Sequence, residues 1–238
     1  MIRRALLTAL TAGLCTGVTC TIRFDEGGNG GGNGNGDIGG PYVPLDDASA
    51  EITIRSVAGD DAVDVTARIR DRLGLTVWLQ REQAVAVNSL ELLGPTGGLY
   101  RRSLPAAGQY VVTVREPTRG VEETLVTAPP ELRILEPTPG GAVSLSGFTL
   151  RWSDADPGQN VTVTLTQVLF GSERRKTFGS LSDTGSRALG AGDLAVFRQG
   201  ADLLIEITRR SNPASLAGFR SGSLVFEQSD NIAVSPGP

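Results

Sequence analysis

Hydrophobic and polar residues alternate along most of the chain beyond residue 50. Between Val63 and Ile69 every second residue is apolar, and the positions between them hold Asp, Thr and Arg. Successive side chains of a β-strand point to opposite faces of a sheet, so this pattern predicts a strand with one buried face. The same period predicts further strands, with apolar positions at Ile52 and Ile54; Leu73, Leu75, Val77 and Leu79; Tyr110, Val112 and Val114; Phe148, Leu150 and Trp152; Val161, Val163 and Leu165; Leu203, Ile205 and Ile207; and Leu224 and Phe226.

Residues that favour turns separate these predicted strands. Gly, Pro and Asp are concentrated at 59–61, 94–98, 117–120, 137–141 and 156–158, and no amphipathic helical pattern lies between the strands. These residue types favour turns because their side chains preset or permit backbone angles that a strand does not use. Many short strands at such spacing predict an all-β fold built from antiparallel sandwiches.

Two consecutive prolines divide the predicted strands into two groups. Proline lacks the backbone N–H that a sheet requires, so the pair at 129–130 interrupts the strands and stiffens a short connection. The parts on either side, 48–129 and 130–238, are each near the size of one immunoglobulin-type sandwich, about 100 residues. We therefore expect two β-sandwich domains in tandem.

A segment in the first part resembles the tyrosine corner of immunoglobulin-like domains. Residues 104–112 read LPAAGQYVV, with Ala106 at the usual acidic position and Val112 at the usual cysteine. The resemblance implies an immunoglobulin-like domain over 48–129, in which the hydroxyl of Tyr110 bonds back to nearby backbone.

A segment in the second part resembles the strand that carries the core tryptophan of fibronectin type III modules. Residues 147–152 read GFTLRW and follow a proline-rich stretch at 136–139. The resemblance implies a fibronectin type III-like domain over 130–238. It places Trp152 in the core, on the strand face that Phe148 shares.

The first nineteen residues have the pattern of a secretory signal peptide. Two arginines within residues 1–4 precede an uncharged, mostly apolar run over 5–18. A run of this length is typical of a signal peptide and too short to span a bilayer as a permanent helix. We therefore expect residues 1–19 to direct export across the cytoplasmic membrane.

Residues 17–20, GVTC, resemble the lipobox of bacterial lipoproteins, in which the cysteine becomes the lipidated first residue of the mature protein. Gly17 and Thr19 depart from the residues that the motif prefers. The resemblance implies a lipid anchor on Cys20 and a protein held in the cell envelope, facing the periplasm or the surface. An ordinary cleaved signal without lipid is the alternative.

A glycine- and asparagine-rich stretch at 27–40 favours the lipoprotein interpretation. Such a flexible coil holds a domain away from a membrane, and we assign residues 20–47 to this tether. The stretch also contains a formal GxGxxG match at 34–39. Because no strand precedes it and prolines follow it, we do not interpret it as a nucleotide site.

Composition excludes several kinds of chemistry. The chain has no histidine, and both cysteines, Cys15 and Cys20, precede the predicted domains. We therefore expect no disulfide, no thiolate or imidazole metal site and no cofactor. A net charge of -4 and a pI near 5.0 argue against nucleic-acid binding. We predict a non-catalytic protein, with a metal-assisted hydrolase using paired carboxylates as a remote alternative.

One turn has oxygen ligands at the spacing that calcium could use. Asp154, Asp156 and Asn160 could bind the ion, although the segment lacks the bidentate glutamate that closes an EF-hand loop. A hydrated turn between strands is the alternative.

Two other features are candidates for ligand binding. Trp78 falls on the face opposite Val77 and Leu79; we expect a neighbouring segment to cover it, with an exposed ligand anchor as the alternative. Arginine clusters could bind an anionic polymer or simply form a solvated face. They are Arg68, Arg70 and Arg72; Arg101 and Arg102; Arg174 and Arg175; and Arg209 and Arg210.

The sequence thus favours an envelope-tethered lipoprotein that acts as a scaffold or spacer. Its expected partners are the membrane, through the lipid on Cys20, and envelope proteins or glycans. The alternative is a module that binds a surface polysaccharide or another extracellular ligand through Trp78 or the arginine-bearing loops.

Overall fold

The computed structural model describes residues 42–80, 82–96 and 98–237. These residues all belong to one compact unit, Asp37–Pro238. The predicted signal peptide at 1–19, the predicted lipidation site Cys20 and the predicted tether up to residue 41 lie outside the described residues.

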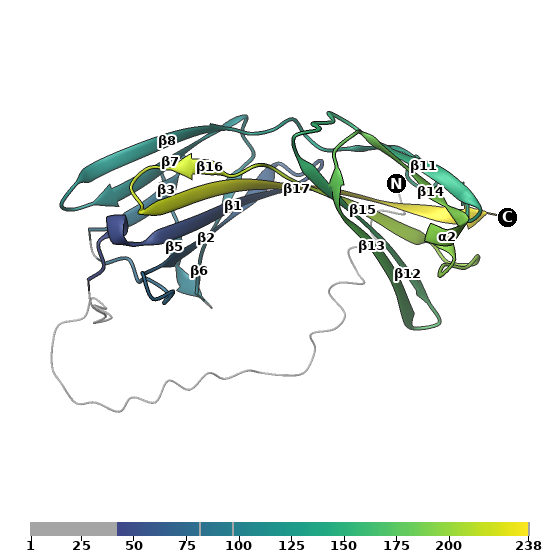
Figure 1. Cartoon of the computed structure of the whole chain (residues 1–238), viewed down its shortest axis with the longest axis horizontal. Coiled ribbons are helices and arrows are strands. Elements are labelled where there is room, and N and C mark those ends of the chain that lie inside the picture. The colour runs from purple at the N-terminus through teal and green to yellow at the C-terminus, as the bar shows by residue number, and fades with distance from the viewer. Residues whose placement is uncertain (1–41, 81, 97, 238) are drawn as a thin grey trace, which may run out of the picture. The chain divides into compact units, whose positions relative to one another are not determined.

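The described chain is all-β, which confirms the predicted fold class (Figure 1). A 3₁₀ turn, η1 (Leu45–Asp47), and one helical turn, α2 (Ala191–Leu194), accompany the strands. The strands are β1 (Ser49–Val57), β2 (Ala62–Arg70), β3 (Ala84–Val87), β4 (Leu90–Glu91), β5 (Leu93–Thr96), β6 (Leu99–Pro105), β7 (Gln109–Glu116), β8 (Gly120–Thr127), β9 (Ile134–Glu136), β10 (Ala142–Ser144), β11 (Gly147–Trp152), β12 (Asn160–Leu169), β13 (Ser172–Ser182), β14 (Ser186–Gly190), β15 (Leu203–Arg210), β16 (Ala214–Leu216) and β17 (Ser221–Gly237).

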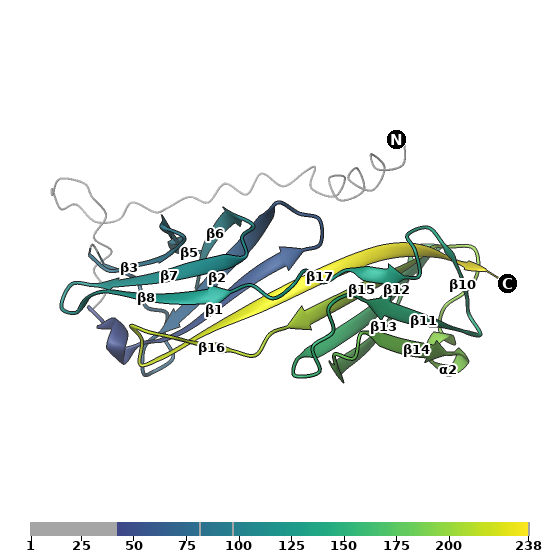
Figure 2. The same ribbon diagram turned by 90° about the horizontal axis from the view of Figure 1, so that it is seen from above.

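One large sheet and two small sheets enclose two separate hydrophobic cores. The large sheet runs β13-β12-β15-β17-β1-β2-β6-β5, and β10 and β16 also pair with β17. The sheet β4-β3-β7-β8 packs on the large sheet over the first core, and the sheet β14-β11-β9 packs on it over the second core. Figure 2 shows β17 continuing from one group of strands into the other.

The first core lies between β1, β2 and β6 on one side and β3, β7 and β8 on the other. Along β1 and β2 buried and exposed residues alternate, as the sequence period predicts. The strand order β1-β2-β6-β5 against β4-β3-β7-β8 is the order of an immunoglobulin-type sandwich with one added edge strand. The backbone N–H of Ala107 donates a hydrogen bond to the hydroxyl of Tyr110, with 3.0 Å between the atoms, as expected for a tyrosine corner.

The second core lies between β12, β15 and β17 on one side and β9, β11 and β14 on the other. Trp152 on β11 is 4% exposed and Leu150 is fully buried, while Phe148 packs against the same core and is partly buried. The predicted burial of Trp152 is therefore confirmed.

The strand β17 belongs to both sandwiches. Its first half pairs in parallel with β1, where Ser49 lies opposite Ser221 and Val57 opposite Ser229. Its second half pairs in antiparallel register with β15, from Glu227 to Val234. The two sandwiches consequently share one continuous sheet.

The first core also contains residues from the C-terminal part of the chain. Leu216, Leu224 and Phe226 pack there, beside side chains from β1 and β2. The consecutive ranges 48–129 and 130–238 therefore do not describe the two cores. Periodicity reveals which side of a strand is buried, but not against which part of the chain it packs.

The predicted strand over 73–79 is wrong. Only one isolated bridge, between Arg70 and Thr76, forms there, and Leu73 is 83% exposed. The reason is Asp71, whose Oδ1 accepts hydrogen bonds from the backbone N–H groups of Leu73 and Leu75 at 2.9 and 2.8 Å. An aspartate that binds the backbone ahead of it favours a turn over a strand.

The assigned tether, 20–47, extends too far at its C-terminal end. Leu45 is fully buried, and Val43 packs against the first core. Residues 42–47 thus belong to the folded part. In the sequence, prolines and acidic residues lie beside these apolar side chains, so the hydrophobic pattern does not indicate a folded segment there.

Candidate functional site

The large sheet turns its outer face away from both cores, and this face is hollowed by two adjoining grooves. The first has a volume of about 680 Å³ and crosses β6, β2, β1 and β17. The second, of about 670 Å³, crosses β17, β15, β12 and β13. Arg210 and Glu227 line both grooves, so the two meet there.

Side chains alternate between the two faces of the sheet along each strand, and this alternation determines which residues line the first groove. On β1, Thr53 lies between the buried Ile52 and Ile54, so its side chain points to the outer face. The register then sets Thr66 of β2 beside Thr53, and Arg101 of β6 beside Thr66. A row of polar side chains therefore crosses three strands.

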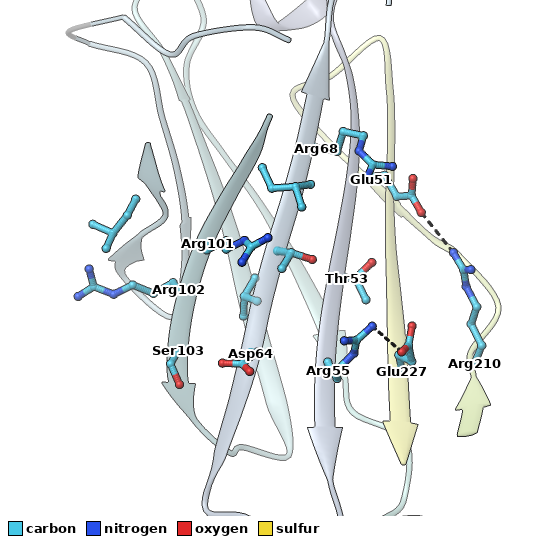
Figure 3. Close-up of a pocket in the computed structure, with 14 residues that line it drawn as sticks. Glu51, Thr53, Arg55, Asp64, Arg68, Arg101, Arg102, Ser103, Arg210 and Glu227 are labelled. Atoms are coloured by element: carbon cyan, nitrogen blue, oxygen red, sulfur yellow. Dashed lines mark hydrogen bonds and ion pairs between the residues drawn. The ribbon is translucent and has the colours of Figure 1, made fainter. Parts of the chain in front are cut away.

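Five arginines and three carboxylates line the first groove (Figure 3). Two of the arginines form ion pairs across strands. Arg55 Nη2 lies 2.7 Å from Glu227 Oε1, and Arg210 Nη2 lies 3.2 Å from Glu51 Oε1. Both arginines are more than half exposed, so water screens these pairs and each contributes little to stability.

The other three arginines of the first groove, Arg68, Arg101 and Arg102, have no carboxylate within 4.0 Å in the described part of the chain. Arg68 lies opposite Glu51 in the register, but Glu51 is paired with Arg210. Figure 3 shows Arg101 reaching from β6 toward β2 and Arg68 lying beside Glu51. The groove thus has cations available to an anionic ligand.

The second groove is rich in hydroxyl and amide side chains. Thr162, Thr164, Thr177 and Thr208 line it, together with Asn160. Each of these groups can donate and accept hydrogen bonds. Two arginines and two glutamates line the groove as well, so it has no net charge and can hydrogen-bond a polar ligand.

Asp156, one of the three candidate calcium residues, has another role in the structure. Asp156 Oδ1 accepts a hydrogen bond from the N–H of Gly158 at 3.0 Å, and its Oδ2 accepts one from Gln159 Nε2 at 2.9 Å. Asp154 is exposed, and Asn160 begins β12. The described residues contain no group of three or more Asp, Glu, His or Cys side chains that could hold a metal. Calcium binding at this turn stays a prediction, which a melting curve with and without EDTA would test.

Trp78 is 46% exposed, so the expectation that a neighbouring segment covers it is wrong. Leu73 and Leu75, in the turn held by Asp71, are 83% and 62% exposed, whereas Val77 is buried. These residues give the β2–β3 connection an exposed apolar surface. Trp78 lies outside the two grooves.

The arginine clusters of the sequence separate in the structure. Arg68, Arg101 and Arg210 line the first groove, and Arg175 lines the second. Arg102 also lines the first groove, but its side chain extends away from β2 (Figure 3). Arg209, in contrast, is 1% exposed and points into the second core.

Arg209 belongs to a buried polar cluster that the sequence did not reveal. Its Nε lies 2.7 Å from Asp183 Oδ2, and its Nη2 donates to the carbonyl of Ser153 at 2.8 Å. The indole N–H of Trp152 donates to Asp183 Oδ1 at 2.5 Å. This cluster connects β11 with β15 and has no access to a ligand, so its role is structural.

A second buried carboxylate, Glu116, fixes the start of the folded part. It is 4% exposed and accepts hydrogen bonds from the hydroxyl of Tyr42, the N–H of Leu45 and the amide of Gln83. Burial alone would raise the pKa of Glu116, but these hydrogen bonds, with the charge of Arg119, outweigh burial and lower it. The hydrogen bond that Tyr42 donates stabilises its own protonated form and raises its pKa.

The sequence matches no known protein family and no curated protein. Among the described residues, no helix is long and apolar enough to cross a membrane. The grooves, the exposed apolar turn and the junction between the two cores are therefore the features from which a function can be argued.

Proposed function

We propose that this protein is a non-catalytic, envelope-tethered lipoprotein that acts as a rigid spacer or scaffold. The observation that carries the proposal is the single strand β17, which pairs with both sandwiches. Two domains that share a sheet cannot bend at a flexible linker, because bending would break backbone hydrogen bonds of both.

The connection between the cores is fixed as well. Gln228, on β17, donates from Nε2 to the carbonyls of Pro129 and Pro130 at 3.2 and 2.9 Å. The N–H of Gly59 donates to Glu131 Oε1 at 2.8 Å; this bond and the nearby Arg133 lower the pKa of Glu131. The proline pair is therefore attached to both β1–β2 and β17 and does not act as a hinge.

The two ends of β17 define the length of the spacer. Ser221 lies beside Ser49, near the point where the chain enters the fold, and the strand, 17 residues long, ends at Gly237. At 3.3 Å per residue this strand spans about 50 Å. A lipid on Cys20 would fix the entry side near the membrane, and the C-terminal end would then project from it.

Fatty-acid labelling tests the anchor on which this proposal depends. The full chain, produced in a bacterium with labelled palmitate, should incorporate label and distribute with envelope membranes. Cys20→Ser should abolish incorporation, and the matched variant Cys15→Ser should retain it. A mature chain without lipid, or label that persists in Cys20→Ser, would contradict the proposal.

A second candidate function, contact with a partner protein, is favoured by the exposed apolar turn. Leu73, Leu75 and Trp78 together expose apolar surface of the kind that interfaces use. A photo-crosslinker at Thr76 should yield a specific adduct in cells. Leu73→Ser with Leu75→Ser should remove that adduct, while Val121→Ser with Leu125→Ser on β8 should not; equal loss in both variants would refute this function.

A further inference from the structure

The first groove is positively charged, although the protein as a whole is acidic. The whole chain has a net charge of -4, yet five arginines and three carboxylates line this groove. None of the four charged residues that line its β2–β6 half forms an ion pair; three are arginines and one is Asp64. An anion placed there therefore meets unpaired cations without first breaking ion pairs.

We propose that the two grooves form one binding surface for an acidic polysaccharide whose sugars carry carboxylate groups. Arg68 and Arg101 bind carboxylates, and the hydroxyl side chains of the second groove bind sugar hydroxyls. This inference is independent of the spacer function, because the outer face is open whether or not the chain is lipidated.

The extent of the two grooves requires an extended ligand. Arg101 of the first groove is on β6 and Thr208 of the second groove is on β15, and the strands between them are β2, β1 and β17. Four steps between neighbouring strands, each about 4.8 Å, separate these two positions by about 19 Å. A single small anion cannot reach both, whereas a polymer with repeated carboxylates can.

The second groove suits the neutral part of such a polymer. It continues from Arg210 and Glu227 across β15, β12 and β13, with threonine hydroxyls along the way. Thr208 lies opposite Thr162 in the register, and Thr177 lies opposite Thr164, whose buried hydroxyl is 3.3 Å from that of Thr177. Paired hydroxyls on adjacent strands give closely spaced donors and acceptors, which match the hydroxyl groups of a sugar ring.

The same surface is less suited to an acidic peptide. Strands β2, β1, β17, β15 and β12 each have a strand on both sides, so their backbone groups are already paired and a peptide cannot bind by strand addition. The exposed leucine of the first groove, Leu93, comes from the end strand β5, and the rest of the surface is mainly charged or hydroxylated. The side chains that anchor a peptide need apolar pockets, and a mainly charged and hydroxylated surface does not provide them.

Binding of polygalacturonate to the full-length chain, purified in detergent, tests the proposal by calorimetry. We expect binding that weakens as salt rises, because exposed charges are screened, and none to neutral dextran. Arg68→Gln with Arg101→Gln should weaken the affinity at least tenfold. The control Arg115→Gln with Arg151→Gln removes the same charge outside both grooves and should change the affinity less than twofold.

Three outcomes would overturn the proposal. They are no binding of polygalacturonate, equal loss of affinity in the groove and control variants, and preferential binding of poly-glutamate, which would assign the surface to acidic peptides. A melting temperature measured for each variant shows that folding is intact; Arg68 and Arg101 are exposed, so we expect it to be unchanged. None of these outcomes bears on the palmitate labelling of Cys20.

Discussion

Asp183 and Arg209 show how a single residue can depend on distant chain segments. Both are buried: Arg209 donates a hydrogen bond to Asp183, and Asp183 also accepts one from the indole N–H of Trp152. The burial of Trp152 could be predicted from the alternation with Phe148. The burial of Arg209 could not, because its neighbour Arg210 suggested an exposed pair and Asp183 lies in a different part of the sequence.

Removal of one partner from this buried pair should be strongly destabilising. Asp183→Asn leaves the guanidinium of Arg209 buried without a counter-charge, which should cost about 3 to 5 kcal/mol of unfolding free energy. The double variant Asp183→Asn with Arg209→Met removes both charges and should recover a large part of that loss. Denaturant titration measures both variants. A double variant no more stable than the single one would contradict the account.

Glu116 should make the stability of the protein depend on acidic pH. Its folded pKa lies below the usual value of 4.5, so its contribution is present above pH 4.5 and is lost as pH falls through the lower folded pKa. The difference in unfolding free energy between the native chain and Glu116→Gln should therefore shrink from pH 7 toward pH 3.

The exposed Glu91 provides the matched control for this measurement, since it forms only a surface pair with Arg115. Glu91→Gln should show little difference from the native chain at any pH. A difference for Glu116→Gln that stayed constant with pH would show that the carboxylate of Glu116 does not stabilise the folded state through its charge.

At the scale of elements, alternation predicted the positions of most core strands but not their partners. The strands around 63–69, 110–114 and 203–207 form as expected. The stretch 73–79 has the same alternation and forms no strand, because the side chain of Asp71 binds the backbone that a strand would need. Local hydrogen bonding therefore overrides periodicity there.

The turn between β16 and β17 is the element that packs the C-terminal part onto the first core. Gly218 has φ +84, and a Cβ added there would lie 2.8 Å from Val114 Cγ1 and 2.9 Å from Val114 Cβ. Gly218→Ala should destabilise the protein by about 1 to 3 kcal/mol, because the buried Val114 must shift. This loss adds to the cost of placing an alanine in a left-handed backbone conformation.

Gly200 is the control for that variant. It has a similar φ of +92, and nothing lies within 4 Å of an added Cβ. Gly200→Ala therefore reports the cost of the left-handed backbone alone, about 1 kcal/mol. Equal unfolding free energies for the two variants, measured by thermal denaturation, would mean that the turn does not contact the first core.

At the scale of the whole molecule, the shared sheet and the grooves could not be predicted from the sequence. The pattern around Leu224 and Phe226 predicts a strand with a buried face. It does not show that this strand lies beside β1, more than 160 residues earlier in the chain. The first groove depends on the same pairing, because it brings Arg210 and Glu227 next to Glu51 and Arg55.

In the proposed function, β17 joins the two sandwiches into one rigid body. Spin labels at Val121→Cys and Phe170→Cys, in a chain carrying Cys15→Ser and Cys20→Ser, measure the distance between exposed sites of the two sandwiches. Gln228→Pro interrupts β17 at its centre and should broaden the distance distribution, whereas Gln228→Ala keeps the backbone bonds and should not. We expect one narrow distribution for the otherwise native chain; a broad or bimodal distribution in that chain would contradict the proposed rigidity.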